Sequence, residues 1–201
     1  MTYEILIALA GFALVTSITP GPNNLMLMAS GANFGLRRTI PHMLGVVLGF
    51  VFMASLVGIG LAQIFDAYPI LHTVLKAVSV LYLLWLAWKI ANASPANMKD
   101  EAGSPLTFLQ AAGFQWVNPK AWSMALTAVT VYSPGVGALN AVLVAVVFGL
   151  VNLPAIGSWA MIGVQMQRVL TNPARLRAFN WTMAGLLVLS LWPVLVPQGT
   201  P

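Results

Sequence analysis

Charged residues are confined to a few places in this chain, and the stretches between them carry no charge at all. Uncharged stretches run from Ile5 to Leu36 (32 residues), from Thr39 to Phe65 (27 residues) and from Ala121 to Gln167 (47 residues). A helix needs about 20 apolar residues to cross the hydrocarbon core of a bilayer, which is roughly 30 Å thick. Each of the two shorter stretches can therefore cross a membrane, and the longest must hold two helices.

The composition points the same way. Of the 201 residues, 59% are hydrophobic and 6% are charged, whereas about 25% of the residues in a soluble domain are charged. A soluble domain of this size leaves roughly 30% of its surface in water, and nine Lys/Arg with four Asp/Glu are too few to cover it. This argues against a soluble enzyme, a nucleic-acid-binding protein and a disordered chain, and predicts an all-α integral membrane protein in contact with the lipid bilayer.

Interruptions by Pro, Gly and polar residues divide the chain into six predicted transmembrane helices. They span residues 3–34, 42–64, 71–91, 106–131, 139–163 and 178–197. A polar segment, 92–105, lies at the midpoint of the sequence. The expected organisation is a first three-helix unit (1–91), this cytoplasmic linker loop (92–105) and a second three-helix unit (106–201).

The positions of Lys and Arg predict the orientation, because cytoplasmic loops carry an excess of these residues. Seven of the nine cations follow the first, third and fifth predicted helices, and the loops after the second and fourth helices have none. The seven are Arg37, Arg38, Lys89, Lys99, Arg168, Arg175 and Arg177. The three loops that carry them are therefore expected in the cytoplasm, with both chain termini outside.

Several kinds of chemistry have no support in the sequence. The chain has no cysteine and only two histidines, so disulfides and thiolate metal sites are excluded and no metal-ligand spacing is present. No glycine-rich phosphate loop follows a strand, and no Ser/His/acid set is found. We therefore predict no enzymatic activity, no metal, no cofactor and no nucleic-acid partner.

The first predicted helix is interrupted in its interior. The segment Thr19-Pro20-Gly21-Pro22-Asn23-Asn24 places two prolines around a glycine, which removes backbone donors and ends a regular helix. Asn23 and Asn24 can then cap a new helix. A simple proline kink is the alternative, since membrane helices tolerate kinks. Irregular backbone at membrane depth persists only inside protein or beside water, so we favour a functional break.

The fourth predicted helix has a similar interruption, at Asn118-Pro119-Lys120. Pro22 and Pro119 are 119 − 22 = 97 residues apart, about half of the chain. With three helices in each half, the first helix runs inward and the fourth runs outward. This pattern predicts two inverted three-helix repeats, each with a discontinuous helix, and such a pair indicates a secondary-transporter site near the bilayer midplane.

Lys120 is the candidate with the strongest electrostatic argument. A cation at the centre of a membrane helix costs on the order of 2.5–3.5 kcal/mol, and no carboxylate is predicted at its depth. Lys120 either extends to the cytoplasmic interface, bonds backbone carbonyls freed by Pro119, or binds the carboxylate of a substrate. We favour the third role, because an ionisable residue inside a membrane is a functional candidate.

Lys76 and Asn152 are accessory candidates. Lys76 lies one turn into the third predicted helix, where it can equally extend to the surface or pair with Asp66. Asn152, two residues before Pro154, marks either another irregularity near the cavity or an interhelical hydrogen bond. His42, next to Pro41 at a membrane edge, is expected to be structural rather than a proton relay. The pairs Gly31/Gly35 and Gly45/Gly49 have the spacing that lets helices pack closely.

These motifs together resemble the lysine-exporter (LysE/RhtB) family of amino-acid exporters. The resemblance rests on Ile18-Thr19-Pro20-Gly21-Pro22-Asn23, on Gly35, Gly45, Gly49 and Lys76, on 82–89 (YLLWLAWK), and on Phe114 with Asn118-Pro119-Lys120. The double Asn and the Ala-Trp-Lys that ends the third helix look most like the cysteine/O-acetylserine exporter branch. The resemblance implies a bacterial inner-membrane efflux protein that forms a homodimer.

The leading hypothesis is an exporter of small neutral amino acids, working by alternating access of its two halves. Its substrate site would comprise Pro20, Gly21, Pro22, Asn23, Asn24, Asn118, Pro119 and Lys120. The absence of a midplane acid argues against a dedicated site for a cationic side chain, and leaves both proton coupling through Lys120 or Lys76 and passive transport open. The alternatives are a membrane-embedded assembly or structural subunit and an ion channel, for which no continuous polar stripe is seen.

Overall fold

The computed structural model describes residues 1–68, 70–93, 104–135 and 137–195, and this part of the chain contains helices and no strands. The elements in order are α1 (Tyr3–Ile18), α2 (Pro22–Leu56), the π-helix η1 (Val57–Leu61), α3 (Ala62–Ala67), α4 (Ile70–Ala91), α5 (Phe108–Val117), α6 (Pro119–Tyr132), α7 (Ala138–Met166), α8 (Pro173–Leu189) and α9 (Trp192–Leu195). Most of the predicted linker, residues 94–103, lies outside the described residues.

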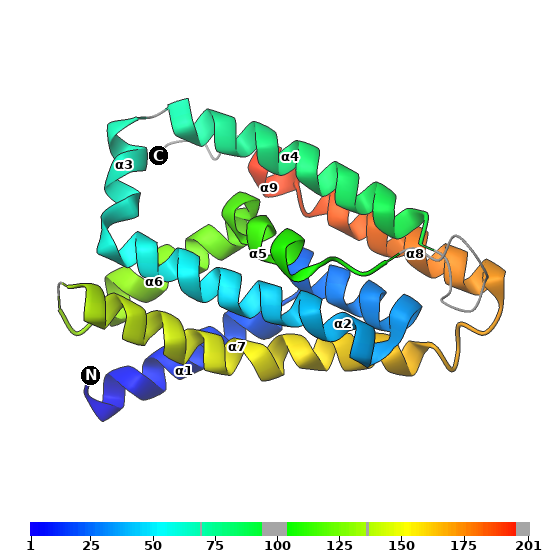
Figure 1. Ribbon diagram of the computed structural model, residues 1–201, viewed down its shortest axis with the longest axis horizontal. Coiled ribbons are helices and arrows are strands. Elements are labelled where there is room, and N and C mark those ends of the chain that lie inside the picture. Colours follow the sequence, from blue (N-terminus) through cyan, green and yellow to red (C-terminus); the bar gives the residue numbers. More distant parts are fainter. Residues whose placement is uncertain (69, 94–103, 136, 196–201) are drawn as a thin grey trace.

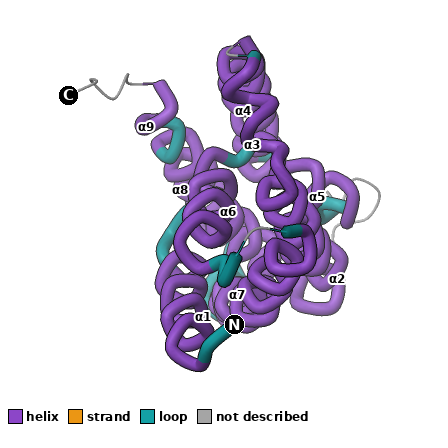
Figure 2. The backbone as a smooth tube through the Cα atoms, turned by 90° about the vertical axis from the view of Figure 1, so that its left-hand side faces the viewer, coloured by secondary structure: helices purple, strands orange, loops and turns teal. Residues whose placement is uncertain are grey.

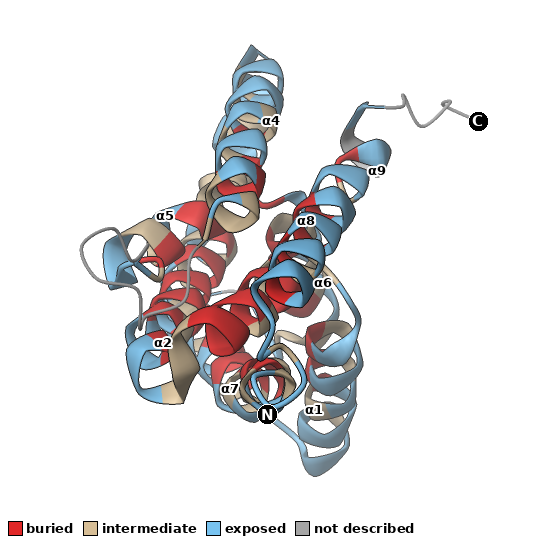
Figure 3. Cartoon of the chain, turned by 90° about the vertical axis from the view of Figure 1, so that its right-hand side faces the viewer, coloured by how far each residue is buried: buried red, intermediate tan, exposed pale blue. Residues whose placement is uncertain are grey.

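Three helical stretches are long and apolar enough to cross a membrane: Pro22–Phe65, Ile70–Ala91 and Ala138–Met166, and the apolar helix Tyr3–Ile18 is shorter. The outward faces of the helices are exposed and the buried residues lie between them (Figure 3). Exposed side chains such as Leu48, Leu81 and Leu150 are large and apolar. Extended apolar surface of this kind fits a lipid environment, so the chain is a membrane protein.

The helices form layers around a central pair. Helices α5 and α6 lie between the α4/α8 pair and a layer made of α1, α2 and α7 (Figures 1 and 2). Helix α2 packs most extensively against α7, α1 packs against α7, α5 packs against α2, and α4 packs against α8. Each half of the chain therefore buries its helices mainly against the other half.

Helix α2 is two helical segments joined by a turn at Gly35. This glycine has φ +76° and ψ 169°, a conformation essentially restricted to glycine. The segments on either side run back along each other at the right-hand end of Figure 1, so we call residues 22–56 the α2 hairpin. The sequence expectation that Gly35 serves helix packing is wrong, because its role is to reverse the chain.

The other three glycines of the two predicted pairs do lie at close helix contacts. A Cβ added at Gly31 would overlap the carbonyl oxygen of Ala160 in α7, and one added at Gly45 would overlap that of Phe108 in α5. A Cβ at Gly49 would lie 2.6 Å from the Cα of Ala112. These glycines therefore let the α2 hairpin touch the backbones of α5 and α7.

Gly163 of α7 makes the reciprocal contact, because a Cβ there would overlap the carbonyl oxygen of Met28 in α2. We predict that Gly163→Ala lowers the free energy of unfolding by roughly 1–3 kcal/mol, the usual result of overfilling a packed interior. The apparent Tm in detergent measures this effect.

Gly185→Ala is the matched control, because nothing lies within 4 Å of the added Cβ at that helical position. The control should leave the Tm unchanged or raise it, since alanine favours a helix over glycine. An equal loss of stability in the two variants would contradict the proposed close α2–α7 contact.

Candidate substrate site at two broken helices

The first break separates α1 from the α2 hairpin at Thr19, Pro20 and Gly21. A proline has no backbone N–H and cannot continue a regular helix in its interior, so the carbonyls that precede the break lose their helical partners. Side-chain donors take the place of these helical partners. Trp159 donates its indole N–H to Ile18 O at 3.1 Å, and Asn24 donates its side-chain amide to Ser17 O at 2.8 Å and Thr19 O at 2.9 Å.

The second break lies between α5 and α6, where Asn118 leaves the helical conformation and Pro119 opens the next helix. The side-chain oxygen of Asn118 accepts a hydrogen bond from the backbone N–H of Lys120 at 3.1 Å, which caps α6. Trp122 donates its indole N–H to Trp116 O at 2.8 Å. Both breaks therefore occur at the motifs that the sequence indicated, and in each an indole satisfies a carbonyl near the end of the first segment.

Lys120 joins the two breaks. Its ammonium, on α6, donates to Thr19 O at 2.6 Å and lies 3.4 Å from Pro20 O. Gly21 makes room for this side chain, since a Cβ there would lie 2.9 Å from Lys120 Cδ and 3.1 Å from Nζ. An ammonium has three donors. Two of them face the carbonyls of the first break, and the third is left for another acceptor.

Gln115 provides a second connection between the broken helices. It is completely buried (0% exposed) and exchanges two hydrogen bonds with Asn23, one of 2.9 Å and one of 3.2 Å. Its amide also donates to Ala111 O at 2.9 Å. Sequence analysis missed Gln115 as a site residue. The available signal was an uncharged amide in an apolar segment, three residues before Asn118.

Two cavities meet at these residues. The central cavity, of about 20 Å³, includes Asn23, Asn24 and Asn152 in its lining. The large cavity, of about 990 Å³, lies beside α3, α4 and α6 and includes Lys76 and His72 in its lining. Gly21, Asn118 and Lys120 line both cavities. A space of about 10–15 Å³ holds one water molecule, so an amino acid does not fit in the central cavity as it stands, whereas the large cavity has ample room.

All ten sequence-predicted residues line one of these two cavities. Those on the central cavity are Gly21, Asn23, Asn24, Asn118, Lys120 and Asn152, and those on the large cavity are Pro20, Gly21, Pro22, Lys76, Asn118, Pro119 and Lys120. The helical irregularity considered for Asn152 is absent, since α7 continues through Pro154. The Asp66 side chain, the alternative partner of Lys76, lies outside the described residues.

Ser17 is a second residue that sequence analysis missed. It is buried on the central cavity, and its hydroxyl has no hydrogen-bond partner in the part of the chain that the structure describes. A buried polar group without a partner costs roughly 1–3 kcal/mol. Together with Asn152, Ser17 therefore offers hydrogen bonds to a molecule that enters this cavity.

The central cavity is rich in amides, and Lys120 is the one cation among the described residues that line it. Within residues 1–68, 70–93, 104–135 and 137–195 no group of three or more His, Cys, Asp or Glu residues could hold a metal ion. No carboxylate whose side chain the structure describes lines the central or the large cavity. Such a lining suits an uncharged polar ligand or one that carries a carboxylate.

Apolar helices around a polar cavity, with two proline-broken helices tied together by a lysine, define the class of membrane translocators. The family model described as "LysE type translocator" matches residues 14–192, and the chain belongs to this family. The family predicted from the sequence motifs is therefore confirmed. Translocators move molecules across membranes and are not enzymes.

The chain is also similar to curated bacterial proteins named "Cysteine/O-acetylserine efflux protein". The protein from Salmonella typhimurium is 35% identical over 191 residues, covering 94% of this chain and 96% of the relative. The protein from Escherichia coli (strain K12) is 32% identical with the same coverage of each chain, and that from Klebsiella pneumoniae is 30% identical over 190 residues, or 94% and 95%. No solved structure matches.

The pair of hydrogen bonds between Asn23 and Gln115 can be tested with a double-mutant cycle. We expect a coupling energy between Asn23→Ala and Gln115→Ala of about 0.6–1.7 kcal/mol, which are the mean and the maximum measured for interhelical hydrogen bonds in a membrane protein. Unfolding in detergent, followed by circular dichroism, measures it. Asn180 shares no hydrogen-bond partner with Asn23, so Asn23→Ala and Asn180→Ala should be additive within about 0.5 kcal/mol. Additivity of the first pair would contradict a direct connection.

Proposed function

We propose that this protein exports small, neutral, zwitterionic amino acids or their derivatives across the bacterial inner membrane. The observation that carries this proposal is the position of Lys120, which bridges both helix breaks and lines both cavities. Irregular backbone at membrane depth is found where it lines a cavity, and in transporters with inverted repeats such breaks form the substrate site. The names of the similar curated proteins support the same substrate class.

Recognition of the substrate follows from the groups available. The carboxylate of an amino acid binds the third donor of the Lys120 ammonium, in a charge-assisted hydrogen bond. The carbonyls of Thr19 and Pro20 are acceptors for the substrate's ammonium group. Because no described residue of the two cavities carries a negative charge, the site has nothing to neutralise a cationic side chain, which favours neutral amino acids.

Alternating access is supported by the packing of the two halves. Exchanging the two three-helix units turns the α1–α7 contact into the α5–α2 contact. The same exchange leaves the α2–α7 and α4–α8 contacts unchanged. This is the relation expected for two inverted three-helix repeats. We propose six membrane crossings with both termini outside, in a protein that assembles as a homodimer.

The cavities suit this orientation. The large cavity includes Phe65, His72 and Lys76, near the predicted outer loop after the second crossing. A third cavity, of about 170 Å³, lies beside the α2 hairpin and the C-terminal end of α4, where the predicted cytoplasmic cations Arg37, Arg38 and Lys89 are found. We call it the hairpin cavity. It shares no lining residue with the other two.

Counterflow in proteoliposomes tests the proposed transport. With L-cysteine or O-acetyl-L-serine loaded inside, we expect wild-type protein to accumulate the labelled amino acid, and Lys120→Met to reduce the initial rate by on the order of 10- to 100-fold. A hydrogen bond to a charged group is worth about 1.5–3 kcal/mol, and about 1.4 kcal/mol corresponds to a factor of ten.

Arg37→Met is the matched control, because it removes one cation from an exposed position that lines none of the three cavities. It should transport like the wild type. Equal counterflow by Lys120→Met would rule out the role given to Lys120. A folded wild-type protein that exchanges no amino acid would instead favour the assembly-subunit alternative.

Thiol labelling tests the orientation, since the chain has no natural cysteine. Ser123 is an exposed residue of the large cavity, and Ser104 is an exposed residue of the hairpin cavity. A membrane-impermeant maleimide should label Ser123→Cys from outside intact cells and Ser104→Cys only in inside-out vesicles. Labelling of both positions from the same side would be incompatible with the proposed crossings.

A further inference from the structure

The hairpin cavity contains a buried histidine that the proposed mechanism does not use. His42 is 1% exposed, and neither ring nitrogen has a hydrogen-bond partner among the described residues. A neutral imidazole has one donor and one acceptor, and leaving such groups unpaired inside a protein costs free energy. The ring lines the cavity, so a bound molecule can supply the partner that the described residues do not.

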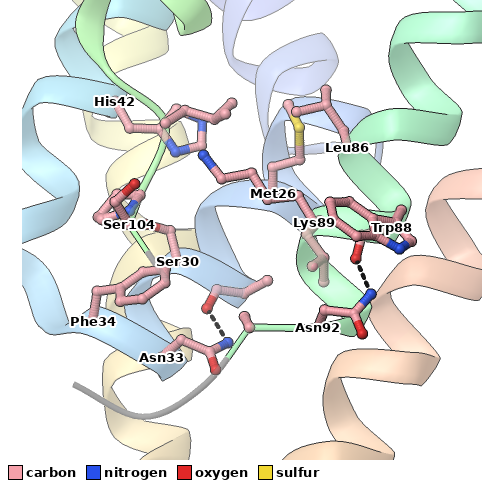
Figure 4. A pocket seen from close by; sticks show the side chains of 15 residues that line it. Met26, Ser30, Asn33, Phe34, His42, Leu86, Trp88, Lys89, Asn92 and Ser104 are labelled. Carbon is pink, nitrogen blue, oxygen red and sulfur yellow. Dashed lines mark hydrogen bonds between the residues drawn. The ribbon is translucent and has the colours of Figure 1, made fainter. Parts of the chain in front are cut away.

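Lys89 lies across the same cavity. Figure 4 shows its side chain extending toward the imidazole of His42. The ammonium lies 5.6 Å from the centre of the Trp85 ring, and it forms no ion pair or hydrogen bond within the described residues. A carboxylate placed between Lys89 and His42 would accept hydrogen bonds from both.

Ser30 supplies the complementary acceptor. The hydroxyl of Thr39 donates its proton to Gly35 O at 2.8 Å, so in the 2.8 Å contact between Ser30 and Thr39 the Ser30 hydroxyl must be the donor. Ser30 lines the cavity, and its Oγ accepts no hydrogen bond from another described residue. Asn92 is similar, because its amide nitrogen donates to Trp88 O at 2.8 Å and its side-chain oxygen remains available.

The hairpin cavity therefore has donors that suit a carboxylate at Lys89 and His42, and acceptors that suit an ammonium at Ser30 and Asn92. We infer that it is a second binding site, which takes the zwitterionic head group of an α-amino acid. This inference rests on the proposed function, since it makes the hairpin cavity the place where the substrate binds before it reaches the breaks.

The first segment of the α2 hairpin connects the two sites. Asn23 lines the central cavity, and Met26, Ser30 and Asn33 line the hairpin cavity. Their spacing of three, four and three residues places all four on one face of the helix. A substrate leaving the hairpin cavity therefore meets a single helix face that leads directly to the breaks.

Protection of an introduced cysteine tests this site without relying on transport. In the purified full-length Ser104→Cys protein, O-acetyl-L-serine should slow labelling by fluorescein maleimide in a saturable manner. Adding Lys89→Met should raise the half-protecting concentration at least tenfold, whereas Lys89→Arg, which keeps the charge, should largely retain protection. N-acetyl-L-serine, which lacks the ammonium, should protect poorly.

Two further variants give the controls. Arg37→Met removes a cation outside the cavity and should leave protection unchanged. Lys120→Met removes the cation of the central site and should also leave the half-protecting concentration at Ser104→Cys unchanged. Absence of saturable protection, or an equal effect of Lys89→Met and Arg37→Met, would overturn the inference.

Different experimental results would contradict the proposed function and the inferred second site. Counterflow by the wild type without protection at Ser104→Cys would keep the exporter and refute the second site. Protection that depends on Lys89, in a protein without counterflow, would retain the amino-acid site in the hairpin cavity and refute export.

Discussion

Backbone carbonyls released by the two broken helices must be satisfied inside a membrane, and the contact of Lys120 with Thr19 O satisfies one of them while it joins the two breaks. Where water is absent, leaving a carbonyl or an ammonium group unpaired costs several kcal/mol for each group. Each break therefore depends on a polar group brought to it, and Lys120 depends on the carbonyls of a helix 101 residues away in sequence. The other freed carbonyls are satisfied by Trp159, Asn24 and Trp122.

Under the proposed function, a substrate can take over the contact that Lys120 makes with the carbonyls of the first break. In this proposal, the substrate's carboxylate binds the third donor of the Lys120 ammonium, and its own ammonium competes with Lys120 for the carbonyls of Thr19 and Pro20. A substrate can therefore replace the direct contact between the breaks by a contact through itself. A ligand shifts a conformational equilibrium only through different affinities for the two states. Under the proposed function, this exchange is where such a difference arises.

The sequence was sufficient for the features that depend on backbone chemistry and on charge. Pro20, Pro22 and Pro119 lack a backbone N–H and interrupt the helices in which they lie, and the scarcity of charge requires a membrane. It was insufficient where one residue type serves several roles. Gly31 and Gly35 have the same spacing as Gly45 and Gly49, yet Gly35 forms a turn. Nothing local distinguishes a glycine needed for close packing from one needed for its φ angle.

Contacts between segments that lie far apart in the chain could not be predicted from the sequence either. Gln115 is separated from Asn23 by 92 positions, and its role appears only when α5 is packed against the α2 hairpin. For His42, the expectation of a structural role followed from its neighbour Pro41 and not from the cavity that it lines. Burial without a partner is a property of the fold, so no pattern in the sequence could report it.

The packing also indicates which element is suited to move. Gly31 and Gly163 place the α2 hairpin and α7 in backbone contact, which leaves no space for one to slide over the other. Helix α4 is different, because only four of its 22 residues are buried: Ser79, Leu83, Leu86 and Ala87. Its Lys76 end lines the large cavity and its Lys89 end lines the hairpin cavity. Under the proposed function, a tilt of α4 about its buried residues would widen one cavity as it narrows the other, and alternating access would leave the α2–α7 pair intact.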